Sequence, residues 1–258
     1  MRTLTSHESE RYERQIRLPC VGPQGQARLK RATVFISGLG GLGSVSSYLL
    51  AAAGVGCLRV VDRDRVELSN LNRQILHWTP DIGRRKTVSA AEKLGAFNPS
   101  CRIEAFDTVV QEENAAGLVG DAAVIVDGSD NVKMRKVLNR VSVEKKIPFV
   151  YGGVEGFNGM VSTLVPGRSA CFECLFGRFE DRSQPPAVLG ALPSLVASIQ
   201  ALEVIKWILG IEEGLVSRLL IIRGAEMTFR TVRTEADPEC AVCGSTGSRN
   251  RVDQGQGE

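Results

Sequence analysis

The feature that most constrains the fold is an apolar run that ends in a glycine-rich turn and leads into a stretch of small residues. Residues 32–37 read Ala-Thr-Val-Phe-Ile-Ser, residues 38–43 read Gly-Leu-Gly-Gly-Leu-Gly, and residues 44–53 are mostly small or apolar. A strand, a tight turn and a helix in this order are typical of a βαβ unit, whose strands lie parallel in one sheet. The backbone N–H groups of such a turn can hold a phosphate, so the turn predicts a nucleotide site.

Strand and helix patterns continue to alternate along the chain. Helical spacing of apolar residues is found at 9–17, 23–30, 86–97, 111–119 and 131–146, and strand-like runs are found at 58–61, 102–106, 123–127 and 148–151. After Tyr151 the pattern changes to short strands near 159–165, 218–222 and 227–232, with one long helix at 192–209. We therefore predict an α/β fold with a Rossmann-like parallel sheet, helices on both faces, and an antiparallel C-terminal half.

This pattern also predicts the domain organisation. We expect a single domain over residues 1–243, with a nucleotide-binding half at 31–150 and a second half at 151–243. Residues 244–258 are polar and almost free of apolar side chains, so we expect a disordered tail.

Charged and polar residues follow two of the predicted strands directly. Residues 62–74 read Asp-Arg-Asp-Arg-Val-Glu-Leu-Ser-Asn-Leu-Asn-Arg-Gln, and residues 127–131 read Asp-Gly-Ser-Asp-Asn. Ligands of open α/β sheets bind at the carboxyl ends of the strands, where a single acid suffices for the ribose of NAD. A triphosphate also needs cations and a carboxylate for Mg²⁺. The residues suited to these tasks are Asp62, Asp64, Asn70, Arg73, Lys86 and Asp130. Each alone could be a solvated surface residue, and for Lys86 taken alone that interpretation is favoured.

Two Cys-x-x-Cys pairs predict a metal site. The pairs are Cys171 with Cys174 and Cys240 with Cys243. Four thiolates suffice for a tetrahedral zinc ion, and with no histidine nearby a closed structural site is favoured over a redox pair or two disulfides. The other three cysteines lie in or beside apolar stretches and are expected in the core: Cys20, Cys57 and Cys101.

The overall composition excludes several classes of protein. The 32 basic residues are nearly balanced by 29 acidic ones, which favours neither a nucleic-acid-binding protein nor a membrane surface. The N-terminus lacks the apolar segment of a secretory signal, and no apolar run approaches the roughly 18 residues that a transmembrane helix needs. We expect a soluble cytoplasmic protein.

Taken together, these motifs resemble the ThiF/MoeB branch of the ubiquitin-activating enzyme superfamily. The resemblance covers about Glu8 to Cys243, and its most specific element is Ser69-Asn70-Leu71-Asn72-Arg73-Gln74. The other motifs that carry it are Arg11-Tyr12-x-Arg14-Gln15, Gly38-x-Gly40-Gly41-x-Gly43, Asp62-x-Asp64-x-Val66 and the two cysteine pairs.

The resemblance implies an ATP-dependent adenylyltransferase. Such an enzyme adenylates the C-terminal glycine of a small β-grasp sulfur-carrier protein ending in Gly-Gly, releases pyrophosphate, and works as a homodimer with Mg²⁺ and structural zinc. By motif, Gly41 and Asp62 are implied to hold the adenosine and ribose, Asp130 to bind Mg²⁺, and Arg14 to reach the γ-phosphate of the partner subunit's ATP. The implied phosphate ligands are Asn70, Arg73 and Lys86.

One departure from the family pattern bears on the mechanism. Many members carry a further cysteine, used for covalent chemistry with the carrier, in the loop after the first Cys-x-x-Cys pair, but residues 177–186 contain none. We expect the adenylate to pass to a separate sulfur donor or to an amine. The alternatives are an NAD-dependent oxidoreductase, which rests on the glycine turn alone, a non-catalytic partner on the same fold, and an adenylyltransferase for a peptide or a tRNA-bound carboxylate.

Overall fold

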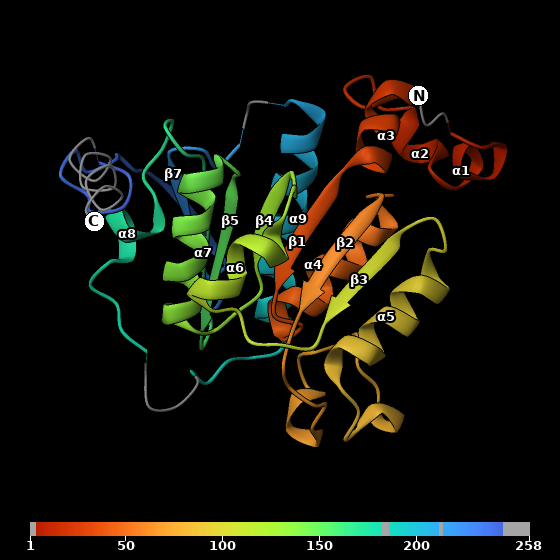
Figure 1. Ribbon diagram of the computed structural model, residues 1–258, viewed down its shortest axis with the longest axis horizontal. Coiled ribbons are helices and arrows are strands. Elements are labelled where there is room, and N and C mark those ends of the chain that lie inside the picture. Colours follow the sequence, from red (N-terminus) through yellow and green to blue (C-terminus); the bar gives the residue numbers. More distant parts are fainter. Residues whose placement is uncertain (1–3, 182–185, 212–213, 245–258) are drawn as a thin grey trace, which may run out of the picture.

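The computed structural model describes residues 4–181, 186–211 and 214–244. Except for Gly244, the tail predicted at 244–258 lies outside the described residues. All the strands that are described belong to one sheet in the order β3-β2-β1-β4-β5-β6-β7-β8 (Figure 1). Their bounds are β1 Thr33–Ser37, β2 Cys57–Val61, β3 Arg102–Phe106, β4 Val124–Asp127, β5 Phe149–Glu155, β6 Asn158–Leu164, β7 Arg218–Arg223 and β8 Thr228–Arg233.

The sheet changes direction at β5, as the sequence predicts. Strands β1 to β5 pair in parallel, with Val34 opposite Leu58 on one side and opposite Val124 on the other. From β5 to β8 every pair is antiparallel, and Phe149 lies opposite Leu164. The two predicted halves therefore form one continuous sheet, because β5 pairs with both β4 and β6.

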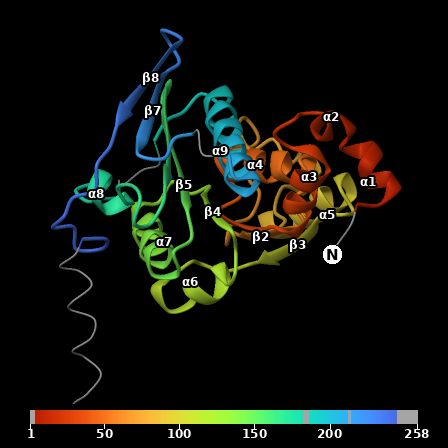
Figure 2. The same cartoon turned by 90° about the horizontal axis from the view of Figure 1, so that it is seen from above.

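Helices cover both faces of the parallel part (Figure 2). The bounds are α1 Ser6–Arg11, α2 Glu13–Ile16, α3 Gly22–Arg31, α4 Gly41–Ala52, α5 Lys86–Phe97, α6 Glu112–Val119, α7 Val132–Lys145, α8 Phe172–Phe176 and α9 Ala191–Leu209. One core cluster joins the sheet to α4, α5 and α9, and a second joins it to α6, α7 and α8. In β1, Val34 and Ile36 belong to the first cluster and Phe35 to the second, so alternate side chains of the strand fill opposite faces.

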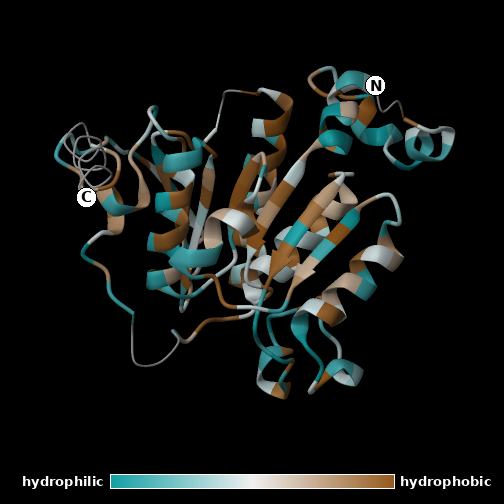
Figure 3. Cartoon of the chain, viewed as in Figure 1, coloured by the Kyte–Doolittle hydropathy of each residue, from teal (hydrophilic) through white to brown (hydrophobic). Residues whose placement is uncertain are grey.

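Hydropathy follows this layering. In Figure 3 the central strands are largely hydrophobic and the outward surface of α7 is largely hydrophilic. A strand buried on both faces needs a continuous apolar run rather than alternation, which is what residues 32–37 provide.

The N-terminal helix predicted at residues 9–17 is divided in two. Helices α1 and α2 meet at Tyr12, which has non-helical dihedral angles (φ −103°, ψ 13°). Its side chain is buried, and its hydroxyl accepts a 2.8 Å hydrogen bond from the Asn98 side chain. This tertiary contact joins the helix pair to the end of α5, and the sequence pattern gave no sign of it.

Helix α9 is the one described helix that is long and apolar enough to cross a membrane, although the sequence predicted no such run. Half of its 18-residue apolar window is buried, and it packs against α4, β5 and β6. The Gln200 side chain, fully buried, donates to the backbone oxygens of Asp127 and Val150. This packing is that of a core helix, and core helices can be as long and as apolar as helices that cross a membrane.

Candidate active site

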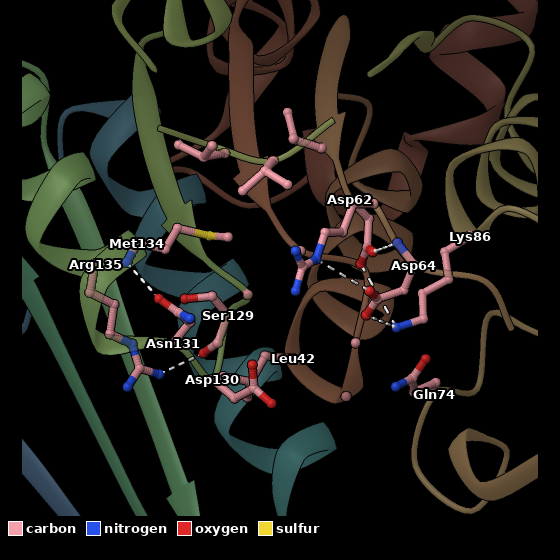
Figure 4. A pocket seen from close by; sticks show the side chains of 18 of the residues that line it. Leu42, Asp62, Asp64, Gln74, Lys86, Ser129, Asp130, Asn131, Met134 and Arg135 are labelled. Atoms are coloured by element: carbon pink, nitrogen blue, oxygen red, sulfur yellow. Dashed lines mark hydrogen bonds and ion pairs between the residues drawn. The ribbon is translucent and has the colours of Figure 1, made fainter. Parts of the chain in front are cut away.

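A cavity of about 960 Å³ lies at the carboxyl ends of β1, β2 and β4. Figure 4 shows Asp62, Asp64 and Lys86 on one side of it and the Ser129–Asn131 segment on the other. All the predicted nucleotide-binding residues except Gly43 and Arg14 line this cavity: Gly38, Gly40, Gly41, Asp62, Asp64, Asn70, Arg73, Lys86 and Asp130. The parallel topology thus brings together segments that are far apart in the sequence.

The glycine turn forms one wall of the cavity and begins α4. Gly38 has a positive φ of 88°, which favours glycine, and its N–H donates to the Val61 carbonyl. A Cβ on Gly43 would lie 1.8 Å from the Gly38 carbonyl oxygen, so this residue permits close packing inside the turn. Gly40 and Gly41 face the cavity, where a ligand's phosphate can approach the backbone. The glycines therefore serve both packing and ligand access.

The Asp62 side chain holds the glycine turn through hydrogen bonds to the backbone. Its carboxylate accepts the N–H of Leu39 at 2.7 Å and the N–H of Asp64 at 2.7 Å. Lys86 lies beside it, with Nζ 3.0 Å from Asp64 Oδ2 and 4.0 Å from Asp62 Oδ2. The Lys86 side chain is only 6% exposed. The interpretation that the sequence alone favoured for this lysine, a solvated surface residue, is therefore wrong, because two carboxylates accompany its charge into the protein.

A short 3₁₀ helix at Leu68–Asn70 carries the next polar group. Asn70 is 8% exposed, and its Oδ1 accepts the Glu67 N–H at 3.1 Å. The Arg73 guanidinium donates to the Ser69 carbonyl at 2.9 Å and reaches the cavity. Gln74 is buried with its Oε1 unpartnered, and it also lines the cavity.

A buried ion pair that the sequence reasoning missed supports the opposite wall. The Arg135 Nε donates to Asp127 Oδ2 at 2.7 Å, and a terminal nitrogen donates to the carbonyls of Ser129 (2.6 Å) and Gly152 (2.9 Å). Burial raises the pKa of the Asp127 carboxyl, whereas Arg135 and Ser129 lower it. The pair ties the exposed Asp130 segment to β5. The sequence signal that could have revealed this ion pair is an aspartate at the end of a strand followed by an arginine eight residues later.

Arg14 is the predicted catalytic residue that the structure places elsewhere. It lies exposed on α2 and does not line the cavity. The neighbouring Gln15 donates to the carbonyl of Ala53, which caps the C-terminal end of α4, whereas the cavity lies at the N-terminal end of that helix. Figure 1 shows α1 to α3 at the end of the sheet away from the carboxyl ends of β1 and β2. Within one chain, Arg14 therefore cannot reach the cavity.

The four predicted metal-ligating cysteines come together. Their Sγ atoms all lie within 4.8 Å of one another, with separations of 3.7 Å for Cys171–Cys174, 3.7 Å for Cys171–Cys240 and 3.4 Å for Cys174–Cys243. A disulfide would need about 2.05 Å, whereas four sulfurs about 2.3 Å from a tetrahedral ion lie about 3.8 Å apart. The cluster therefore fits one metal ion and joins α8 to the C-terminal segment.

The remaining cysteines follow the prediction in part. Cys57 and Cys101 are buried, and burial raises the pKa of both thiols, that of Cys101 to about 12. The prediction for Cys20 was wrong, because this residue is exposed. It lies in the turn between α2 and α3, where Leu18 is 51% exposed, although Val21 on its other side packs against the core.

Comparison with known proteins gives the class that this fold and cavity define. The pattern of the ThiF family matches residues 12–242, and the chain belongs to that family. It is 40% identical over 258 residues to "Sulfur carrier protein adenylyltransferase" from Thermus thermophilus, covering 96% of this chain and 95% of the relative. It is 41% identical over 250 residues to "SAMP-activating enzyme E1" from Haloferax volcanii, covering 95% and 92%.

Solved structures agree with this assignment. The crystal structure of E. coli MccB with ATP is similar at a TM-score of 0.81 and 26% identity, covering 93% of this chain and 75% of that one. The family, the near full-length identity and the cavity identify the protein as an adenylyltransferase of this class. The alternative of an NAD-dependent oxidoreductase is therefore set aside.

Proposed function

We propose that this protein uses ATP to adenylate the C-terminal carboxylate of a small ubiquitin-like sulfur-carrier protein ending in Gly-Gly. The observation that carries the proposal is the polar cavity beside a glycine turn, in a chain about 40% identical over nearly its full length to a sulfur carrier protein adenylyltransferase. The names of the relatives from Thermus thermophilus and Haloferax volcanii favour a protein carrier over a peptide or a tRNA-bound acceptor.

In the proposed step a carboxylate oxygen of the carrier attacks the α-phosphorus of ATP. A new oxygen–phosphorus bond forms, and the bond from the α-phosphorus to the oxygen bridging to the β-phosphate breaks. Pyrophosphate leaves with that electron pair, and the carrier becomes an acyl-adenylate. Because two anions must meet, the protein contributes position and positive charge and needs no nucleophile. Asn70, Arg73 and Lys86 hold the phosphates, while Gly41 and Asp62 hold the adenosine and ribose.

The charge of the cavity supports further cations in this step. Six carboxylates and five cationic side chains line it, so ATP would add its negative charge to an already acidic site. Asp130 is one of the exposed carboxylates at the cavity, and it is the one to which we assign Mg²⁺, an ion that would neutralise phosphate charge. Arg14 would supply another cation from the partner subunit of a homodimer, since its own chain holds it at the far end of the sheet.

The four-cysteine cluster fits structural zinc. Cys171, Cys174, Cys240 and Cys243 together leave no ligand position for a substrate, and the sulfur separations match a tetrahedral ion. The metal would fasten α8 to the segment after β8 and so complete the half of the domain, residues 151–243, that we propose meets the carrier.

The fate of the adenylate follows from the free thiols. Cys57 and Cys101 are buried with raised pKa values, and the zinc would occupy four others. Cys20 is exposed, but it lies between α2 and α3, at the end of the sheet away from the cavity. A separate sulfur donor, or an amine, would therefore accept the acyl group. The predicted cytoplasmic location fits this role and stays a prediction.

Pyrophosphate exchange tests the proposal. We expect the purified protein to incorporate labelled pyrophosphate into ATP only when both Mg²⁺ and a carrier ending in Gly-Gly are present. A carrier lacking its last two residues is the matched control, because it keeps the globular body and removes the reacting carboxylate. Exchange that is equally fast with the truncated carrier, or absent with every Gly-Gly carrier, would contradict the proposal.

A further inference from the structure

A chain of buried polar groups runs from α5 to the glycine turn without lining the cavity itself. It consists of Lys93, Ser89, His77 and the carbonyl of Leu39. Ser89 is fully buried, His77 is 3% exposed, and neither is among the cavity residues. Because buried polar groups cost free energy unless they are paired, the arrangement is stable only if every link is made.

Every link is within hydrogen-bonding distance. Lys93 Nζ lies 2.8 Å from Ser89 Oγ, and Ser89 Oγ lies 2.9 Å from His77 Nδ1. His77 Nε2 lies 3.1 Å from the Leu39 carbonyl oxygen. Lys93 is held in turn by an ion pair with Asp81, and its Nζ lies 4.7 Å from the centre of the Trp78 ring. This row of hydrogen-bonded side chains is therefore anchored through Lys93 at the end away from the cavity.

The chemistry of the two ends and a neutral imidazole together fix the direction of all three hydrogen bonds. An ammonium group can only donate and a carbonyl oxygen can only accept. The Leu39 carbonyl therefore requires the imidazole proton on Nε2. In a neutral ring Nδ1 is then an acceptor, so Ser89 Oγ, which accepts from Lys93, donates its proton to His77 Nδ1. Burial lowers the pKa of His77, and the positive charges of Lys86 and Lys93 lower it further, against opposing contributions from the Leu39 carbonyl and the charge of Asp62. The ring is thus neutral with one defined tautomer.

This tautomer determines which way the glycine turn presents its backbone. The Leu39 N–H donates to Asp62, and the Leu39 carbonyl accepts from His77, so both polar groups of this residue are held. The described chain contains no cis peptide bonds, and in a trans peptide the N–H points opposite to the carbonyl of the same unit. Holding the Leu39 carbonyl toward His77 therefore turns the Gly40 N–H to the opposite side, where Gly40 lines the cavity.

We propose that His77 is a positioning residue for the nucleotide: its neutral ring, protonated on Nε2, holds the Leu39 carbonyl so that the Gly40 N–H faces the phosphates. The proposal rests on the proposed function only in taking ATP as the ligand of the cavity. His77 does not touch the ligand and acts through Leu39. Ser89 and Lys93 support it by fixing the tautomer.

The test compares two substitutions of His77 by ATP titration. His77→Leu removes the donor and is expected to weaken ATP binding roughly tenfold, the scale of one hydrogen bond to a backbone group. His77→Gln can place an amide N–H near the position of Nε2, so it should bind within about threefold of the unaltered protein. In exchange assays the Leu variant should raise KM for ATP more than it lowers kcat, because the reacting groups remain.

A second pair of variants tests the same chain one step further away. Ser89→Ala removes the acceptor of Lys93 and the donor to His77, and we expect ATP binding to weaken by about threefold. The matched control is Ser142→Ala in α7, which also removes a nearly buried hydroxyl. This hydroxyl donates to the Ile147 carbonyl at 2.6 Å. The control should lose a similar amount of stability and bind ATP normally.

Nitrogen NMR of the unaltered protein decides the question if His77→Leu does not fold. We expect the two ring nitrogens of His77 to show a neutral ring protonated on Nε2 at pH 7. A proton on Nδ1, or a charged ring, would overturn the proposal, as would equal ATP affinity in folded Leu and unaltered proteins. If the unaltered protein binds no ATP at all, the proposed function fails, while the NMR result still reports on the His77 arrangement.

Discussion

Replacing Lys86 by methionine should separate activity from stability. The Lys86 side chain is 6% exposed and lies between the carboxylates of Asp62 and Asp64 at the cavity. Loss of one preorganised charge typically costs on the order of a hundredfold in rate, or about 2.7 kcal/mol. Because removing the charge also makes the acidic cavity more negative, we expect the exchange rate to fall by at least about that factor.

The effect on stability should be much smaller. Asp64 is 56% exposed, so solvent screens its ion pair with Lys86, and such a pair contributes under about 1 kcal/mol. Asp62 is 8% exposed but keeps its hydrogen bonds from the N–H groups of Leu39 and Asp64, so no carboxylate is left unpartnered. Methionine fills most of the volume of the lysine stem. We therefore expect Tm to change by no more than about 2–4 °C.

Pyrophosphate exchange and thermal unfolding, measured on the same preparation, check this prediction. Lys206→Met is the matched control, since Lys206 pairs with the nearly buried Glu203 on α9 and does not line the cavity. It should change Tm to a similar extent and leave exchange unaffected. An exchange rate for Lys86→Met within threefold of the unaltered protein, or a rate loss matched by the control, would refute the reasoning.

Three further outcomes are expected. Metal analysis should find about one zinc per chain. Cys174→Ser should lower Tm and leave the affinity for ATP nearly unchanged, because the ion contributes to folding. Zinc-free protein with an unchanged Tm would contradict this. Mixing Arg14→Ala and Lys86→Ala subunits should restore part of the activity, since one site of the mixed dimer has both residues; no recovery after demonstrated subunit exchange would place Arg14 outside the reaction. Intact-mass spectrometry of a reaction with ATP and carrier should show no thiol-labile adduct, and one that disappears in Cys20→Ser would identify Cys20 as a nucleophile.

The sequence by itself determined the sheet and the class of site. The apolar run at residues 32–37 is typical of a strand that is buried on both faces. The glycine turn that follows is typical of the connection between such a strand and a helix whose N-terminus binds phosphate. Parallel strands place their carboxyl ends at one edge, so polar residues after two of them had to meet. Local pattern and topology suffice for these conclusions, as they do for the cysteine pairs.

Tertiary structure alone decided how each charged group is partnered. Nothing in the local sequence of Lys86 shows that it is buried, because burial depends on Asp62 and Asp64 arriving from another strand end. The Asp127–Arg135 pair and the contact of His77 with Leu39 likewise join groups whose partners are set by packing. A titratable side chain is ionised or neutral, exposed or buried, according to what surrounds it in three dimensions. For that reason the sequence predicted where the site lies, and the folded chain determined which partners hold each residue there.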